Sequence, residues 1–269
     1  MSKYALITGA SAGIGKEIAE VLAEKKYNLV LTARREDRLI DLVSELKQKY
    51  DISADYITSD LADRNAPQTL YDFCKSKNYD VEVLINNAGY GIADQFHETS
   101  VEVEEKFIAV LGTSVITLTK LFIGDMLKRG TGQIMIVSSV AAFAPPSTIQ
   151  VLYGPIKTFM NRFSDAINVN HKHKGISSTA LCPGYTVTEF HTASGTQEQM
   201  DKVPGFLKLD ARRVAREGID AMLQRKSLCI PGKRYRFLVF MMNYFSFLIR
   251  LGSNALTGGR YKRLSLIHI

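Results

Sequence analysis

The segment Thr8-Gly9-Ala10-Ser11-Ala12-Gly13-Ile14-Gly15 is the strongest indication of the fold, because it joins an apolar run at residues 4–8 to a helical pattern. Glycine permits a positive φ and lets the backbone approach a ligand closely, and a helix start presents unpaired N–H groups to an anion. A turn of small residues is the alternative, but the position between a strand and an amphipathic helix favours nucleotide binding. The residues that we expect to hold a pyrophosphate are Gly9, Ser11, Gly13, Ile14 and Gly15.

Short apolar runs alternate with helical patterns along the rest of the chain. This alternation predicts βαβ units around a parallel sheet, so we expect an α/β fold, a Rossmann-like doubly wound parallel sheet with helices on both faces. Apolar residues at helical spacing over residues 100–129 predict one long helix. The expected strands are residues 4–8, 28–32, 54–58, 81–85, 133–137 and 177–181.

The charge of the chain is concentrated near its end. The net charge is +7, from 34 Lys and Arg and 27 Asp and Glu, and nine of the basic residues follow Asp220, the last acidic residue. We therefore expect a near-neutral single domain over residues 1–232, followed by a basic, apolar segment over residues 233–263. Residues 264–269 are those that a common transposase adapter sequence encodes, so we expect an assembly scar there.

The C-terminal segment allows two interpretations. Residues 237–249 are uncharged and rich in aromatic side chains, and the basic flank is Lys233, Arg234, Arg236 and Arg250. The run is short for a membrane span, which needs ~20 residues. It suits either a helix in the interface of an anionic membrane or an apolar cover over a substrate pocket or a subunit contact.

Several classes of site and location find no support in the sequence. Cys74, Cys182 and Cys229 form no C-x-x-C pair, which indicates neither a disulfide framework nor a thiolate metal site. The histidines show no zinc spacing, although His191 is a candidate to line a substrate mouth, so we predict no metal. No secretory signal and no nucleic-acid motif is recognisable, which favours a cytoplasmic protein with no nucleic-acid partner.

The end of the second expected strand indicates which dinucleotide would bind. An NAD-selective site usually places Asp or Glu there to bind the ribose 2′-OH, but this chain has Ala33. Arg34 follows, and its guanidinium can fork around a 2′-phosphate. Arg35 either stacks on adenine, adds charge or belongs to the solvated start of the next helix. The pattern favours NADP(H).

Tyr153-Gly154-Pro155-Ile156-Lys157 places a phenol and an ammonium one helical turn apart on the same face. A phenol has an unperturbed pKa of ~10, and a nearby ammonium together with an oxidised nicotinamide would move it toward acid and base work near neutrality. Ser139 ends the preceding strand, where its hydroxyl could bind a substrate oxygen as charge develops. We predict that Ser139, Tyr153 and Lys157 are catalytic.

Taken in order, the glycine loop, Asn86-Asn87-Ala88-Gly89, Ser139, the Tyr153 and Lys157 pair and Pro183-Gly184 resemble the classical short-chain dehydrogenase/reductase family. The match covers residues 3 to about 230. The resemblance implies that Tyr153 donates a proton to a carbonyl, that Lys157 holds the nicotinamide ribose and lowers the pKa of Tyr153, and that Ser139 orients the carbonyl. It also implies homo-oligomers. The further cofactor contacts that it implies are Asp60, Leu61, Asn87, Ala88, Gly89, Pro183, Gly184, Thr186 and Thr188.

The chain departs from the family pattern at three places. Leu111 stands where the family usually has a catalytic Asn in the long helix, which puts the proton-refilling water relay in doubt, although its backbone carbonyl could hold a water. Pro155-Ile156 replaces a frequent Ala-Ser, and the loop from Ser139 to Tyr153 is one residue longer. We expect an NADPH-dependent oxidoreductase for a fairly apolar, lipid-like or steroid-like carbonyl or alcohol. The alternative is a catalytically inactive NADP(H)-binding sensor or scaffold.

Overall fold

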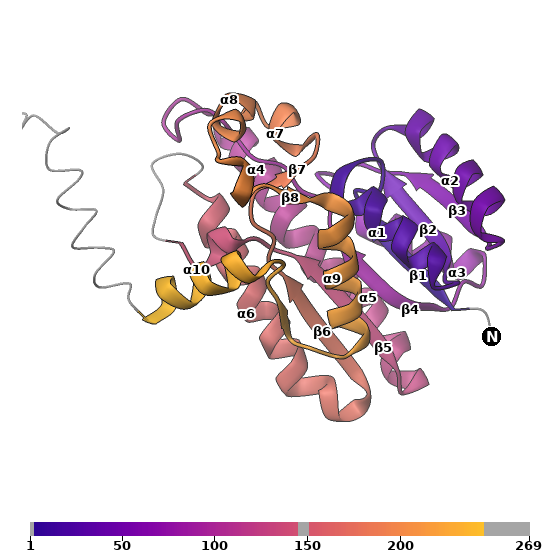
Figure 1. Cartoon of the computed structure of the whole chain (residues 1–269). Helices are drawn as coiled ribbons and strands as arrows, with labels where there is room; N and C mark the ends of the chain where they lie inside the picture. The colour runs from indigo at the N-terminus through magenta and orange to yellow at the C-terminus, as the bar shows by residue number, and fades with distance from the viewer. Residues whose placement is uncertain (1–2, 145–150, 245–269) are drawn as a thin grey trace, which may run out of the picture.

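A seven-stranded parallel sheet forms the centre of the chain, in a computed structural model that describes residues 3–144 and 151–244 (Figure 1). The spatial order is β3-β2-β1-β4-β5-β6-β9. Because β1 pairs with both β2 and β4, the strand order reverses beside it, which is the point where open α/β sheets bind ligands. The strands are β1 Tyr4–Thr8, β2 Asn28–Ala33, β3 Ala54–Thr58, β4 Val81–Asn86, β5 Gly132–Val137, β6 Ile176–Leu181 and β9 Leu228–Cys229.

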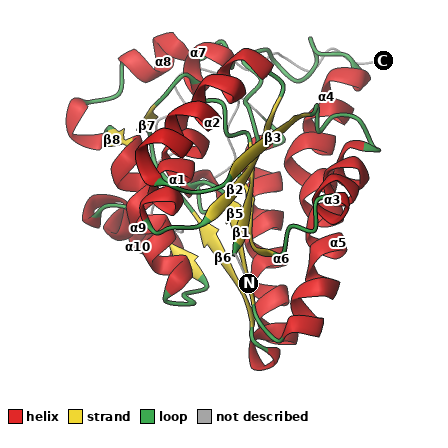
Figure 2. Cartoon of the chain, turned by 90° about the vertical axis from the view of Figure 1, so that its right-hand side faces the viewer, coloured by secondary structure: helices red, strands yellow, loops and turns green. Residues whose placement is uncertain are grey.

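Helices cover both faces of the sheet (Figure 2). Neighbouring residues of β1 enter opposite cores, because Ile7 packs with the side of α1, α2 and α9 while Leu6 packs with the side of α3, α5 and α6. Burial on both faces explains why the strands are apolar throughout rather than alternating. These helices are α1 Gly13–Glu24, α2 Glu36–Tyr50, α3 Ala66–Ser76, α4 Val101–Ile108, α5 Ser114–Arg129, α6 Tyr153–His171 and α9 Ala211–Leu223.

The doubly wound fold predicted from the sequence is confirmed. All six expected strands form, and four of them are one residue longer than predicted. The sequence analysis missed β9, which pairs with the end of β6, and the separate pair of β7 Thr186–Val187 with β8 Leu209–Asp210. Strands of two residues are too short to form an apolar run or an alternating pattern that the sequence could reveal. The remaining short helical turns are η2 Val140–Ala142, η3 Lys172–Lys174, α7 Phe190–Ala193, α8 Gln197–Asp201 and η4 Gly205–Leu207.

The long helix predicted over residues 100–129 forms, with one irregular turn. α4 and α5 are joined by a π-helical turn, η1 Ala109–Thr113, and together they span Val101–Arg129. This span is long and apolar enough to cross a membrane, but Leu118, Phe122 and Met126 are buried in the core. We therefore regard it as a core helix of the domain.

The predicted C-terminal segment begins as helix α10 Lys233–Tyr244. Tyr235 and Val239 are buried, so one face of α10 packs on the domain. Residues 245–269, which include part of the apolar run and the expected scar at residues 264–269, lie outside the described residues. The extra length predicted between Ser139 and Tyr153 also falls partly outside them, at residues 145–150.

Candidate active site

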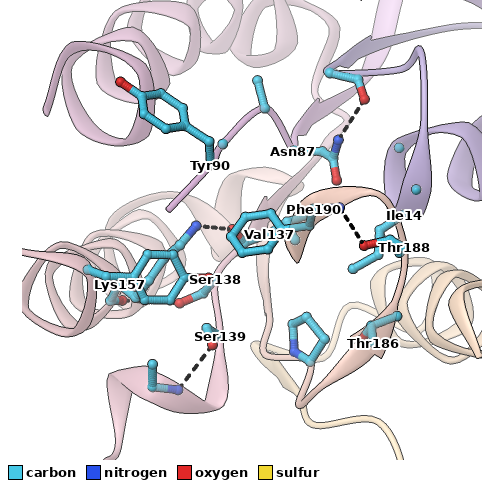
Figure 3. A pocket seen from close by; sticks show the side chains of 18 of the residues that line it. Ile14, Asn87, Tyr90, Val137, Ser138, Ser139, Lys157, Thr186, Thr188 and Phe190 are labelled. Atoms are coloured by element: carbon cyan, nitrogen blue, oxygen red, sulfur yellow. Dashed lines mark hydrogen bonds between the residues drawn. The ribbon is translucent and has the colours of Figure 1, made fainter. Parts of the chain in front are cut away.

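A cleft of about 1800 Å³ lies at the carboxyl ends of the parallel strands (Figure 3). It runs from the glycine loop to α10. Every residue that the sequence analysis selected for catalysis or cofactor binding lines this one cleft. They are Gly9, Ser11, Gly13, Ile14, Gly15, Arg34, Asp60, Leu61, Asn87, Ala88, Gly89, Ser139, Tyr153, Lys157, Pro183, Gly184, Thr186 and Thr188.

The glycine loop has the backbone shape that close approach to a ligand requires. Gly9 and Gly13 have φ of +66° and +55°, which favour glycine. A Cβ on Gly9 would lie 2.8 Å from the Cα of Ala88, and a Cβ on Gly15 would overlap the Gly9 carbonyl and the Asn87 amide. The loop is therefore folded tightly at the start of α1, as a pyrophosphate cradle requires.

Asn87 and Thr8 hold the ends of β4 and β1 together beneath the cleft. The Asn87 Nδ2 donates to the carbonyl oxygens of Thr8 at 2.9 Å and Gly9 at 3.2 Å. In return, the Thr8 Oγ1 accepts the backbone N–H groups of Asn87 and Ala88, both at 3.0 Å. Asn87 therefore fixes the start of the glycine loop against the end of β4 (Figure 3).

Tyr153 and Lys157 lie side by side at the start of α6, as the four-residue spacing predicts. Lys157 is buried, and its Nζ lies 5.5 Å from the centroid of the Tyr153 ring. The same Nζ donates to the carbonyl of Val137 at 2.8 Å (Figure 3). Ser139 caps η2, where its Oγ accepts the N–H of Ala141 at 3.1 Å. The three side chains thus share one end of the cleft.

Burial sets the ionisation of this pair. It lowers the pKa of Lys157 to about 8 and raises the pKa of Tyr153 to about 12, against the opposing effect of a side-chain hydrogen bond with Ser139. Desolvation of the phenolate is the largest effect on the pKa of Tyr153, and the lowering of this pKa by Lys157 together with an oxidised nicotinamide stays a prediction. The phenol is protonated at neutral pH, which is the form that can donate a proton.

Leu111 lies within the π-helical turn η1 and is buried. A Cβ on Gly89 would lie 3.6 Å from the Leu111 Cγ, so this side chain packs beneath the turn that follows β4. The position therefore supplies apolar packing rather than an amide. The polar groups that Leu111 can offer to a water are therefore those of its own backbone, such as its carbonyl.

Helix α10 forms the wall of the cleft opposite the glycine loop, through Tyr235, Leu238 and Met242. The Tyr235 hydroxyl accepts the N–H of Tyr185 at 3.0 Å and donates to the carbonyl of Leu207 at 2.7 Å. Its ring covers Gly184 so closely that a Cβ there would overlap it. The inner face of α10 therefore fits the interpretation of the C-terminal segment as a cover over the pocket.

The sequence analysis missed the contacts that Glu189 and Phe190 make directly after Thr188. Phe190 faces Tyr153 with ring centroids 6.3 Å apart, and Glu189 pairs with Arg35 and Arg38 of α2. Arg35 is therefore an ion-pair partner rather than only a solvated helix start. His191 lines the cleft, as anticipated, and burial lowers its pKa. The position of Glu189 and Phe190 in the loop after Pro183-Gly184 was the sequence signal that could have placed them in the cleft.

Comparison with known protein families gives a match over most of the chain. The family model described as short chain dehydrogenase matches residues 3–199. This match covers the sheet from β1 to β6 and every residue that the sequence analysis placed in the cleft.

Among curated proteins, the very-long-chain 3-oxoacyl-CoA reductase of Anas platyrhynchos is 29% identical over 202 residues. The match covers 72% of this chain but only 63% of that reductase. Dehydrogenase/reductase SDR family protein 7-like of Drosophila melanogaster is 29% identical over 246 residues, which cover 88% of this chain and 72% of the fly protein.

Solved structures share the fold over nearly the whole chain. A short-chain dehydrogenase from Sphingobium yanoikuyae in complex with NADPH aligns with a TM-score of 0.81 at 24% identity and covers 99% of both chains. An alcohol dehydrogenase from the archaeon Thermococcus sibiricus complexed with 5-hydroxy-NADP aligns with a TM-score of 0.75 at 25% identity, over 87% of this chain and 97% of the other.

Proposed function

Because the chain belongs to the short chain dehydrogenase family, we propose that it is an NADPH-dependent oxidoreductase that acts on a carbonyl or alcohol group of an apolar, lipid-like or steroid-like substrate. Membership in this family supports an oxidoreductase activity with a nicotinamide cofactor, as the motifs predicted. The observation that carries the proposal is that Ser139, Tyr153 and Lys157 share one cleft with the glycine loop.

The reaction chemistry follows from the side chains of this cleft. The cofactor supplies or accepts the hydride when bound. In the reductive direction, the Tyr153 hydroxyl donates its proton to the carbonyl oxygen, and the Ser139 hydroxyl hydrogen-bonds that oxygen as negative charge develops on it. The raised pKa of Tyr153 keeps the phenol protonated, which is the form that donates a proton. The Lys157 ammonium, whose pKa is about 8, adds positive charge beside the phenol.

The residues at the end of β2 support a preference for NADP(H), the cofactor that carries a 2′-phosphate. Ala33 closes this strand without a carboxylate for a ribose 2′-OH, and Arg34 lines the cleft directly after it. Arg35 also lines the cleft and donates to the Ser11 Oγ of the glycine loop at 3.2 Å. Positive charge beside the adenosine end favours a 2′-phosphate over a 2′-hydroxyl.

The wall of the cleft around Tyr153 supports an apolar substrate. Apolar side chains come from η2, the η4 turn and α10, including Val140, Leu207, Leu238 and Met242. Similarity to reductases named for very-long-chain 3-oxoacyl-CoA leads us to propose a ketone on a long acyl chain as the first substrate class to test.

The test follows NADPH absorbance with 3-oxoacyl thioesters of increasing chain length. We expect kcat/KM to rise with chain length, because each added CH₂ buried in the cleft contributes about 0.8 kcal/mol, and we expect NADPH to be preferred over NADH. A protein that binds NADPH but oxidises none of it with these thioesters, with steroids or with simple aldehydes and ketones would instead be the sensor or scaffold.

We also propose that the outer face of α10 contacts an anionic membrane surface, in a cytoplasmic protein that forms homo-oligomers. Phe237, Phe240 and Tyr244 are exposed on this helix, and Lys233 and Arg236 are exposed beside them. Such a face places aromatic groups at the acyl boundary and cations at the headgroups.

Liposome flotation tests the membrane contact. The wild-type protein is expected to float with vesicles that contain phosphatidylserine and to remain behind with vesicles of phosphatidylcholine alone. The double variant Phe237→Ser and Phe240→Ser removes exposed apolar groups, so it is expected to lose flotation while it retains activity on a water-soluble carbonyl. Equal flotation of the variant and the wild type would contradict the contact.

A further inference from the structure

A partly exposed ion-pair cluster lies at the glycine-loop end of the cleft. Glu189, which follows β7, accepts hydrogen bonds from Arg35 at 3.0 Å and from Arg38 at 2.7 Å. Arg35 directly precedes α2 and Arg38 lies in its first turn, both more than 150 positions earlier in the chain. All three side chains are about half exposed at 41–53% of their surface, so water and ligands can reach them.

The Glu189 carboxylate occupies a position built for an anion. Two guanidinium groups hold it, and Arg35 also donates to the Ser11 Oγ through its Nη2 at 3.2 Å. The cluster thus combines a glycine-loop hydroxyl with two forked cations, the groups that bind phosphate oxygens. Ser11, Arg35 and Glu189 all line the cleft.

The segment that carries Glu189 also touches the glycine loop and the catalytic end. A Cβ on Gly13 would lie 3.2 Å from the Thr188 Cβ, and Figure 3 shows Thr188 beside Ile14. The next residue but one, Phe190, donates its backbone N–H to the Thr188 Oγ1 at 3.2 Å and faces Tyr153. Glu189 therefore fastens the loop beside the catalytic tyrosine to the adenosine end of the cleft.

We propose that Glu189 is a specificity-determining residue that competes with the cofactor 2′-phosphate for Arg35 and Arg38, the two arginines that lie just beyond Arg34 in the sequence. The inference rests on the proposed use of NADP(H), and it adds that Glu189 weakens the binding of this cofactor. When the phosphate binds, it takes over the hydrogen bonds from Arg35 and Arg38 and displaces the carboxylate. Removing the Glu189 charge should then tighten the binding of nucleotides that carry a 2′-phosphate, and of no others.

Calorimetric titration of the full chain with adenosine 2′,5′-bisphosphate and adenosine 5′-monophosphate tests the competition, because the two nucleotides differ only in the 2′-phosphate. Exposed ion pairs contribute up to about 1 kcal/mol, so Glu189→Gln is expected to lower the Kd for the bisphosphate roughly three- to fivefold. The Kd for the monophosphate is expected to stay unchanged. Glu189→Ala is expected to act in the same way.

Glu198→Gln is the matched control, since it removes an exposed carboxylate from the neighbouring helix α8. It should alter neither Kd. A bisphosphate Kd that stays the same or rises in both Glu189 variants, or a shift shared by the two nucleotides, would overturn the inference. Should the wild-type protein bind the two nucleotides equally, the proposed preference for NADP(H) would itself fail. A wild-type preference without tightening in the variants would refute the role of Glu189 alone.

Discussion

Replacing Tyr153 by Phe is expected to lower kcat/KM for carbonyl reduction by about 10²- to 10⁴-fold, the usual contribution of a positioned proton donor. The substitution removes only the hydroxyl. The ring stays between Phe107 and Phe190, whose centroids lie 6.5 and 6.3 Å away, so the packing of this end of the cleft is preserved. The Kd for NADPH, measured by fluorescence titration, should therefore change little while turnover is lost.

Tyr90→Phe provides the control for this loss. Tyr90 also lines the cleft, and its ring packs on Phe107 at 5.5 Å, so the variant removes a second phenolic hydroxyl from the same neighbourhood. Most of the activity should survive in Tyr90→Phe. Turnover of Tyr153→Phe at the wild-type rate would rule out the phenol as the proton donor and point to a different donor.

Gly15→Ala is expected to destabilise the domain by about 1–3 kcal/mol and to abolish detectable NADPH binding. The added Cβ would overlap the Gly9 carbonyl and the Asn87 amide. To relieve this overlap, the hydrogen bonds from Asn87 to Thr8 and Gly9 must shift, and the glycine loop must open. The loop would then present its N–H groups in the wrong places for a pyrophosphate.

Urea unfolding of Gly15→Ala beside Gly124→Ala measures this difference directly. Gly124 lies within α5 and is exposed, and among the described residues no atom beyond the adjacent residues and the backbone of the helix itself lies within 4 Å of the position that a Cβ would take there. Alanine at this position should stabilise the protein by roughly 0.5–1 kcal/mol, because it favours the helix. A Gly15→Ala protein as stable as the wild type and still able to bind NADPH would show that the loop tolerates the methyl group.

The fold and the candidate site were largely predictable because their determinants are local. The glycine loop, the Tyr153 and Lys157 pair and Pro183-Gly184 each occupy a few consecutive positions at a strand end or a helix start, and the sheet brings these ends together. A motif therefore predicts both the local backbone and its place in the cleft.

The features that the sequence did not reveal depend on distant contacts or on short elements. Glu189 meets Arg35 across 154 positions, and Tyr235 covers Gly184 across about 50, with no pattern in either segment that names its partner. The pKa of Tyr153 depends on how deeply the fold buries it. A doublet such as Leu228–Cys229 becomes a strand only because the edge of β6 is there to pair with it.

The contact of Tyr235 with Gly184 limits how the C-terminal helix can be exchanged. The Tyr235 side chain covers Gly184 and binds the backbone of Tyr185 and Leu207 through its hydroxyl, while Leu238 and Met242 on the same helix line the cleft. A graft that replaces α10 to alter substrate choice must therefore keep an aromatic hydroxyl at position 235. Redesign of the pocket can vary the residues one turn further along the helix, and the cofactor loop stays in place.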